Sequence, residues 1–274
     1  GHKPVHWCLD CKSALAEAEV EYVDKESCSV DVRFRIIDNH EFLTRTGLNL
    51  DQTDLPIYLP IWTTTLWTLP ANQAVVLGED LNYLLVATES DQGPHFVIVS
   101  EGLQKSIRDR WQVEKWHVIS SVNPVDLEGL QLQHPFYKRQ IPTLIGDYVT
   151  LDAGTGAVHT APAHGHDDFI IGQKHDLPLE NPVDDFGIFT PSTEYFSGQH
   201  VFKIDDAIIE KLEENDNLIH QQPFVHSYPH CWRHKTPLIF RATPQWFISM
   251  DQMNFRTACL EAIETVEWMP DWGK

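Results

Sequence analysis

The chain of 274 residues has few cysteines, and it lacks any long apolar run. Five cysteines are too few for a disulfide scaffold of this size, and an odd count without a secretory signal predicts a reducing, cytoplasmic compartment. No apolar stretch approaches the roughly 20 residues that a membrane-spanning helix needs. We therefore expect no membrane partner.

Basic residues are also scarce, since 20 Lys and Arg stand against 40 Asp and Glu and give a formal net charge of -20. Binding to nucleic acid depends largely on neutralising phosphate groups, so this balance argues against an autonomous nucleic-acid binder. Any contact with RNA should be local, or supplied mostly by another part of a larger protein. Apolar residues make up 42% of the chain, which is enough for a sizeable core.

Two nucleotide-binding signatures are missing, G-x-G-x-x-G and G-x-x-x-x-G-K-[ST], and strands do not alternate regularly with helices. Val30, Val32, Phe34 and Ile36 instead alternate with charged residues, which predicts a half-buried strand. Further short apolar runs, separated by turn-forming residues, predict strands at 57–61, 74–77, 83–87, 95–99, 141–151 and 157–161.

Fewer segments show a helical pattern, and the predicted helices cover about 101–111, 166–175, 205–214 and 252–264. Strands dominate the middle of the chain and helices decorate it. The pattern indicates an α+β fold with a curved or barrel-like β-sheet core and peripheral helices.

Hydroxyl groups gather in the segment Thr63-Thr64-Thr65-Leu66-Trp67-Thr68-Leu69-Pro70-Ala71-Asn72. Hydroxyls both donate and accept hydrogen bonds, so they can hold a substrate carbonyl, an amine or an attacking water. Threonine also favours strands, so composition alone favours the plain end of a strand over a site.

A second segment, Gly154–Asp168, contains three histidines and two carboxylates beside glycines: His159, His164, His166, Asp167 and Asp168. Glycines permit tight backbone turns, and the start of a helix is expected to follow. Such a cluster can relay protons, bind a metal, or anchor an ammonium group through a carboxylate. The alternative is that the aspartates only complement the helix dipole.

Two short cysteine motifs lie far apart, Cys8-x2-Cys11 and Cys231-x2-His234. Together they supply the four ligands of a tetrahedral structural zinc site, provided that the two ends of the chain meet in space. The alternative is two unrelated pairs of buried side chains.

The two long motifs together resemble the editing insertion of class I aminoacyl-tRNA synthetases for branched aliphatic amino acids, and within that group the isoleucine enzyme most. His226–Arg233 and Arg241–Phe247 also match, so the resemblance covers nearly the whole chain. The adenylation motifs H-I-G-H and K-M-S-K-S are absent. The resemblance implies an editing domain at 23–222, and a connecting stem, with the zinc motif, at 1–22 and 223–274.

The implied activity is hydrolysis of valine wrongly attached to the 3′ end of tRNA(Ile), in a protein that also contains the remainder of the synthetase. A missing methylene changes binding by only about 1–3 kcal/mol, as the isoleucine enzyme itself illustrates, so a second pocket is needed to reject valine. No cofactor is needed for this hydrolysis, although a structural zinc ion is expected.

The resemblance also assigns roles by position. Asp168 is expected to accept hydrogen bonds from the substrate α-ammonium, because a charge-assisted bond suits a cation. His159 is expected to line the side-chain pocket and to leave no room for isoleucine. The other expected site residues are Thr64, Thr65 and Thr68, which would hold the adenosine, ester and water, and Thr63, Trp67 and Asn72, which would shape the pocket.

Two alternatives of a different class remain open at the level of sequence. One is a metal-dependent hydrolase that uses His159, His164, His166 and Asp167, because H-x-H-D-D resembles the H-x-H-x-D-H of binuclear zinc hydrolases. The other is a zinc-knuckle RNA-binding module without catalytic activity, against which the net charge of -20 weighs.

Overall fold

A computed structural model describes residues 1–50 and 54–273, which form two compact units. The larger unit is Pro4–Ala242, and the smaller unit combines Gly1–Lys3 with Thr243–Lys274. The larger unit contains all the described residues of the expected editing domain, 23–222, and the four residues of the expected zinc site. The expected division into an editing domain and a stem stays a prediction.

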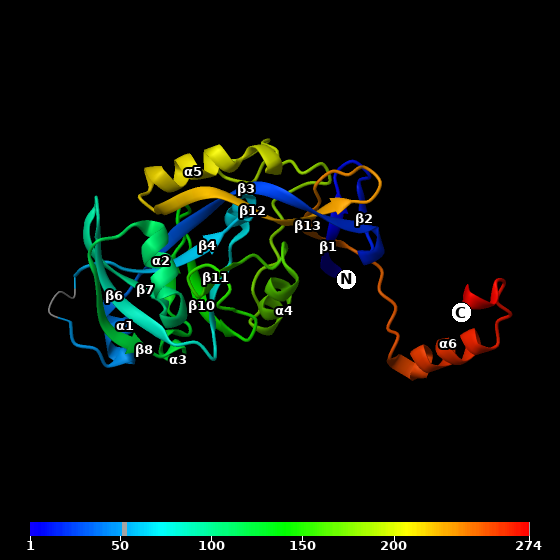
Figure 1. The fold of residues 1–274 in the computed structure, drawn as a ribbon, viewed down its shortest axis with the longest axis horizontal. Coiled ribbons are helices and arrows are strands. Elements are labelled where there is room, and N and C mark those ends of the chain that lie inside the picture. The colour runs from blue at the N-terminus through cyan, green and yellow to red at the C-terminus, as the bar shows by residue number, and fades with distance from the viewer. Residues whose placement is uncertain (51–53, 274) are drawn as a thin grey trace. The chain divides into compact units, whose positions relative to one another are not determined.

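Ten strands of the larger unit form one mixed sheet (Figure 1), and three further strands form a small one. The bounds of the large sheet are β3 (Val20–Ile36), β4 (Ile57–Thr63), β5 (Ala74–Gly78), β6 (Tyr83–Ser90), β7 (Gly93–Ser100), β8 (Trp116–Val122), β9 (Gln131–Gln133), β10 (Gln140–Gly146), β11 (Ala157–Thr160) and β12 (Leu218–Cys231). The small sheet has the order β13 (Ile239–Pro244), β1 (His2–Cys8) and β2 (Ser13–Leu15).

The large sheet is curved rather than open. Its strand order is β11-β5-β10-β9-β3-β4-β7-β6-β8, with β12 added beside β3. Strand β11 stands at one end of this order, yet it packs against β4 near the middle. An α+β fold with a curved sheet is therefore confirmed.

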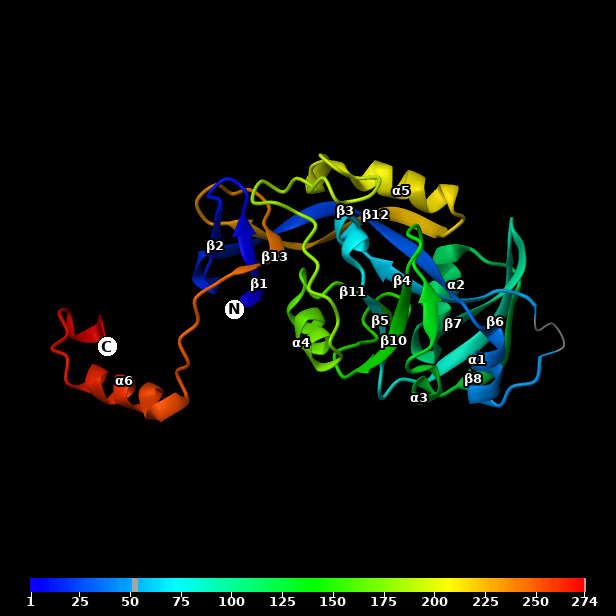
Figure 2. The same cartoon turned by 180° about the vertical axis from the view of Figure 1, so that it is seen from behind.

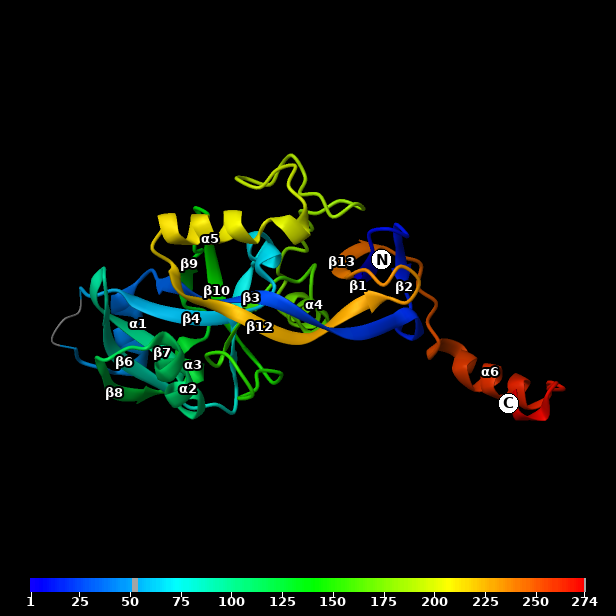
Figure 3. The same ribbon diagram turned by 45° about the horizontal axis from the view of Figure 1, so that its top comes forward.

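A long two-stranded ribbon leaves the large sheet. Strand β3 pairs antiparallel with β12 from Val32 opposite Leu218 to Val20 opposite Cys231. Figure 3 shows the two strands running side by side along the body. The carboxyl-terminal half of β3 also pairs with β4, so one strand belongs to both the ribbon and the sheet.

The prediction of a half-buried strand at residues 30–36 is wrong in one respect. Val30, Val32 and Phe34 face the main core, as expected, but the charged residues between them are buried as well. Asp31 is 1% exposed and Arg33 is 7% exposed. Asp31 is covered because Arg110 of the neighbouring helix α2 (Gln104–Trp111) reaches over this second face and binds its carboxylate.

The helices lie around the sheet, and Figure 1 shows α5 running along β3 and β12. Helix α1 contacts α3, and α3 packs on β10. The helices of this unit are α1 (Asn39–Thr46), α2 (Gln104–Trp111), α3 (Pro124–Leu127), α4 (His166–Lys174) and α5 (Asp205–Glu214), with 3-10 turns η1 (Glu17–Glu19), η2 (Leu66–Ala71), η3 (Glu101–Leu103) and η4 (Val201–Lys203).

The smaller unit contains helix α6 (Phe255–Glu264) between the 3-10 turns η5 (Gln252–Asn254) and η6 (Asp271–Gly273). Helix α6 buries none of its residues, and Trp246 before it is fully exposed at 101%. Within residues 1–50 and 54–273, no helix is both long enough and apolar enough to cross a membrane.

Candidate functional site

The threonine-rich segment begins at the end of strand β4 and continues into the 3-10 turn η2. The N–H of Thr65 donates to Thr63 Oγ1 over 3.0 Å, which turns the chain at the end of the strand. Pro70 lies inside the 3-10 turn, where its fixed φ is tolerated. From Leu66 to Ala71 every residue of this turn is buried, so the segment is part of the core and not a surface loop.

Strand pairing brings the second motif against the first. Strands β5 and β11 are antiparallel with Val75 opposite His159, so His159 lies beside the residues that follow the threonine-rich segment. Asn72 Nδ2 lies 2.7 Å from His159 Nδ1, and Thr68 Oγ1 lies 2.9 Å from His159 Nε2. Thr68 Oγ1 in turn donates to the carbonyl of Thr65 over 2.8 Å.

These contacts fix the protonation of the imidazole. The atom of Asn72 that faces Nδ1 is the amide nitrogen Nδ2, which can only donate. The ring proton therefore lies on Nε2 and is donated to Thr68. Burial lowers the pKa of His159 to about 3, so the ring stays neutral at physiological pH. His159 therefore presents a fixed, neutral imidazole between the two motifs.

Two glycines with positive φ shape the loop that leads into β11. Gly154 has φ +89° and Gly156 has φ +87°, values that L side chains rarely adopt. A Cβ atom on Gly156 would also lie 2.3 Å from the Cβ of Ser100. Tyr83 donates to the carbonyl of Gly156, and Arg110 donates to the carbonyl of Gly154 over 3.2 Å.

Asp168 lies in the first turn of helix α4, which Figure 2 shows near β11. Its Oδ2 accepts the N–H of Ala161 over 2.8 Å, which holds the partly buried carboxylate against the end of β11. Burial raises the pKa of Asp168 to about 7, and the charge of Asp167 adds to the rise. Asp167 itself is exposed.

His164 connects the same loop to Trp67. Its Nδ1 donates to the carbonyl of Phe240 over 2.9 Å, and its ring meets the Trp67 ring edge-on at 4.8 Å between centroids. Burial lowers the pKa of His164 to about 4, so this imidazole is neutral too.

Thr64 and Thr65 line a small cavity beside the threonine-rich segment. The cavity is also lined by residues that sequence reasoning missed, Lys25, Asp205 and Tyr228. The Lys25 ammonium lies 4.3 Å from the centroid of the Tyr228 ring. No local sequence signal could have found these residues, because they come from β3, α5 and β12.

The structure therefore brings His159, Thr68 and Asn72 into direct contact, and it places Trp67 against His164. Asp168 joins this cluster through the backbone of Ala161. Among the hydrogen bonds of residues 1–50 and 54–273, none links the Asp168 side chain to a threonine of the segment.

The two cysteine motifs meet in the larger unit. The ligand atoms of Cys8, Cys11, Cys231 and His234 all lie within 4.8 Å of one another. Cys11 Sγ lies 3.9 Å from Cys231 Sγ and 3.3 Å from His234 Nδ1. Tetrahedral zinc with Zn–S near 2.3 Å and Zn–N near 2.0 Å has ligand-to-ligand edges of about 3.5–3.8 Å, so these separations fit the ion.

Both motifs have the same local geometry. The N–H of Lys12 donates to the carbonyl of Cys8, and the N–H of Lys235 donates to the carbonyl of Cys231, each over 2.8 Å. Lys12 and Lys235 both adopt a positive φ, of 54° and 57°. Each motif thus forms a tight knuckle that turns its side chains toward the other.

The histidine cluster of the second motif does not converge in this way. In the part of the chain that the structure describes, the cysteine set is the one group of three or more such side chains placed to hold a metal. Both nitrogens of His159 are already hydrogen-bonded, and His166 and Asp167 are exposed. The geometry therefore disfavours the metal-dependent hydrolase that the sequence left open.

Comparison with known proteins agrees with the family resemblance seen in the sequence. A family model described as class I tRNA synthetases (I, L, M and V) matches residues 1–274. An isoleucine–tRNA ligase of Vibrio vulnificus (strain YJ016) is 54% identical over 275 residues, which cover 100% of this chain. The isoleucine–tRNA ligase of Vibrio campbellii (strain ATCC BAA-1116) is 53% identical over 277 residues. This chain spans 29% of the length of each of these relatives.

Two solved structures with a similar fold are editing domains. The P. knowlesi cytosolic leucyl-tRNA synthetase editing domain has a TM-score of 0.55 at 12% identity, over 74% of this chain and 97% of that one. The P. falciparum cytosolic leucyl-tRNA synthetase editing domain has a TM-score of 0.55 at 10% identity, over 73% and 99%. The sequence relatives give the family and the structures give the fold: the chain belongs to the class I aminoacyl-tRNA synthetases and has the fold of the leucyl-tRNA synthetase editing domains.

Proposed function

We propose that the chain hydrolyses valine from misacylated valyl-tRNA(Ile) after transfer to the tRNA. The observation that supports this most directly is the contact of His159 with Thr68 and Asn72, which joins the two motifs into one buried wall. A rigid neutral wall suits discrimination by size, because a pocket that admits valine must exclude one additional methylene. The tRNA contact is expected to be limited to the 3′ end, since the net charge is -20.

In the proposed reaction, a water molecule attacks the carbonyl carbon of the aminoacyl ester. The bond from that carbon to the ribose oxygen breaks, the ribose oxygen takes a proton, and the products are valine and tRNA with a free 3′-terminal hydroxyl. Asp168 accepts hydrogen bonds from the α-ammonium, and Thr64 and Thr65 hold the ester and the water. Thr68 supports the wall, because its hydroxyl proton is donated to Thr65.

A deacylation assay tests this proposal. The chain is incubated with valyl-tRNA(Ile) and, separately, with isoleucyl-tRNA(Ile), and the remaining ester is measured over time. We expect the valyl ester to be cleaved and the isoleucyl ester to be spared. Equal rates on both esters, or no cleavage of the valyl ester at micromolar enzyme, would contradict the proposal.

We also propose that Cys8, Cys11, Cys231 and His234 hold a structural zinc ion. The separations of their ligand atoms, between 3.3 and 3.9 Å for the pairs in contact, support this proposal. Four protein ligands leave no open position on a tetrahedral ion, so the ion would stabilise the fold and take no part in hydrolysis.

A further inference from the structure

Lys25 places an ammonium group beside the threonines of the candidate site. It lies on strand β3 and lines, together with Thr64 and Thr65, a cavity of about 40 Å³. A bound water needs about 10–15 Å³, so the cavity has room for a carbonyl oxygen and about one or two waters, and it is too small for a whole amino acid.

The ammonium is held by aromatic rings and not by a carboxylate. Its Nζ lies 4.3 Å from the centroid of the Tyr228 ring and 5.1 Å from that of the Phe202 ring. Within residues 1–50 and 54–273, no hydrogen bond or ion pair engages Nζ, and Nζ is absent from the unpartnered atoms that are closed to solvent. The N–H donors of Lys25 are therefore free to bind a group that enters the cavity.

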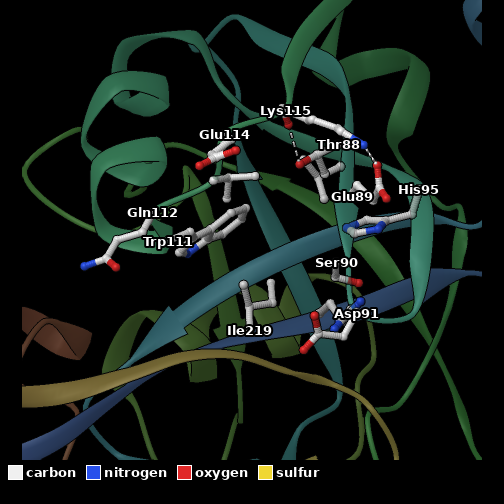
Figure 4. A pocket seen from close by; sticks show the side chains of 13 residues that line it. Thr88, Glu89, Ser90, Asp91, His95, Trp111, Gln112, Glu114, Lys115 and Ile219 are labelled. Atoms are coloured by element: carbon white, nitrogen blue, oxygen red, sulfur yellow. Dashed lines mark hydrogen bonds and ion pairs between the residues drawn. The ribbon is translucent and has the colours of Figure 1, made fainter.

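Another lysine that lines a cavity shows the more usual arrangement. Lys115 lines the larger cavity between the β6–β7 hairpin and the end of helix α2, and its ammonium pairs with the carboxylate of Glu89 (Figure 4). The cavity beside Lys25 also has one carboxylate, Asp205 at the start of helix α5, but Asp205 attracts Lys25 from beyond ion-pair distance. Burial lowers the pKa of Lys25, as expected for an ammonium that is partly removed from water.

The charges around the cavity restrict what Lys25 could bind. Asp205 balances the charge of Lys25, and His226, which lies opposite Lys25 on β12, adds no positive charge because burial and Lys25 lower its pKa. A phosphate group, which is always charged, gains little from a site without net positive charge. An ester carbonyl oxygen is neutral in the substrate and negative in the tetrahedral intermediate, and donors fixed in place stabilise such a developing charge.

We propose that Lys25 is a further catalytic residue of the proposed deacylation, on which this inference rests, and that its ammonium binds the ester carbonyl oxygen. Thr64 and Thr65, which hold the ester and the water in that reaction, bring this oxygen to the cavity. The water oxygen bonds to the carbonyl carbon, and an electron pair of the carbonyl moves onto the oxygen beside Lys25. The pair then returns, the bond to the ribose oxygen breaks, and the ribose oxygen takes the proton that the water loses. Lys25 donates hydrogen bonds throughout and transfers no proton.

The test compares Lys25→Met with the parent chain in deacylation of valyl-tRNA(Ile). Methionine keeps an apolar stem between the rings and removes the charge. With the chain in saturating excess, the rate should fall about a hundredfold, as for the loss of one donor to an oxyanion. The chain concentration that gives half of the maximal rate should change less than about twofold, because the carbonyl oxygen of the bound ester is still neutral.

Lys115→Met is the matched control, since it removes a lysine from a cavity that contains no residue of the two motifs. It should change both values less than about twofold. The parent rate in Lys25→Met would overturn the inference and leave the proposed function intact, whereas a parent chain that does not cleave the valyl ester would overturn the proposed function itself. An unchanged maximal rate with weaker half-saturation would mean that Lys25 binds the tRNA backbone, which also overturns the inference.

A second pair of variants separates catalysis from a structural role of Lys25. Asp205→Asn removes the carboxylate that attracts Lys25, and it should keep at least about half of the parent rate, because the ammonium donors remain. The double variant Lys25→Met with Asp205→Asn should stay as slow as Lys25→Met. Recovery of the rate in the double variant would show that the loss came from a carboxylate left without its cation, and that Lys25 serves only the fold.

Discussion

His159 donates from Nε2 to Thr68 Oγ1 over 2.9 Å, a contact between residues that are 91 positions apart in the sequence. We expect His159→Ala to remove bulk from the proposed amino-acid pocket, so that isoleucyl-tRNA(Ile) is hydrolysed while valyl-tRNA(Ile) is still accepted. Because Thr68 and Asn72 both lose a buried partner, the free energy of unfolding should fall by about 1–3 kcal/mol. Deacylation of both esters and urea denaturation measure the two effects.

His166→Ala is the control for this substitution, since His166 is exposed at the start of helix α4. It should change neither discrimination nor stability. If His159→Ala lowers stability but leaves discrimination intact, the size limit lies elsewhere in the pocket, and Thr65 becomes the better candidate.

Asp168→Asn should slow hydrolysis of the valyl ester by about ten- to a hundredfold, because it removes the charged acceptor proposed for the α-ammonium. Specificity should change little, since every aminoacyl substrate carries the same ammonium. The matched variant Asp167→Asn alters an exposed neighbour and should keep most activity. A larger loss in Asp167→Asn than in Asp168→Asn would place the anchor one residue earlier.

The same carboxylate predicts a dependence of stability on pH. Burial raises the pKa of Asp168 in the folded chain to about 7, against about 3.9 in an unfolded chain, so the folded state holds the proton more tightly. The contribution of this group is therefore fully present below about pH 4 and is lost as pH rises through 7. At pH 8, Asp168→Asn should be more stable than the parent by roughly 1–4 kcal/mol, and the difference should shrink toward pH 4. Urea denaturation at several pH values measures it, and a difference that does not change with pH would contradict it.

Elemental analysis should find about one zinc ion per chain, and removal of the ion by a chelator should lower the melting temperature. Cys11→Ser should reduce the zinc content, whereas Cys28→Ser, which changes a cysteine outside the set, should not. Deacylation by metal-free chain that remains folded should be unchanged. Zinc retained in Cys11→Ser, with activity lost on chelation, would instead place the metal at the histidine cluster.

Arg110 pairs with the buried carboxylate of Asp31 over 2.8 and 2.7 Å and also binds the carbonyl of Gly154. Arg110→Met should cost about 3–5 kcal/mol of stability, because it leaves Asp31 charged and unpaired. Arg108→Met, at an exposed position of the same helix, is the control. The double variant Asp31→Leu with Arg110→Met should recover much of the loss, and failure to recover would mean that the bond to Gly154 dominates. Thermal unfolding distinguishes these outcomes.

Local sequence patterns predicted some of the elements and none of their pairings: the long strand β12 was not expected, and the strand expected at 141–151 ends at Gly146. Strands at 74–77 and 157–161 and a helix at 205–214 appear as β5, β11 and α5, because hydrophobic periodicity is a local property. The parallel pairing of β10 with β5, with Thr143 opposite Val75, joins segments separated by several other elements. Such pairings depend on the whole chain, and no short motif encodes them.

The residues of the candidate site were also predictable only in part. Residue types and resemblance indicated His159, Asp168 and the cysteines, because their chemistry is visible in short motifs. The burial of Arg33 was not predictable, since a charged residue that alternates with apolar ones normally faces solvent. Only the structure shows that the second face of β3 is covered and that a cavity opens beside it.

Strand β3 runs as one unbroken element from the proposed zinc site to the threonine-rich segment. Val20 pairs with Cys231, and Val30 pairs with Thr63. The side chains of a strand alternate between its faces, so removing one residue from β3 would turn every later side chain to the opposite face. Val30 would then leave the core. The ribbon can therefore be lengthened or shortened only in steps of two residues, made in β3 and β12 together. An engineer who wished to change the separation of the cysteine knuckles from the threonine-rich segment could do so in increments of about 7 Å, and in no smaller ones.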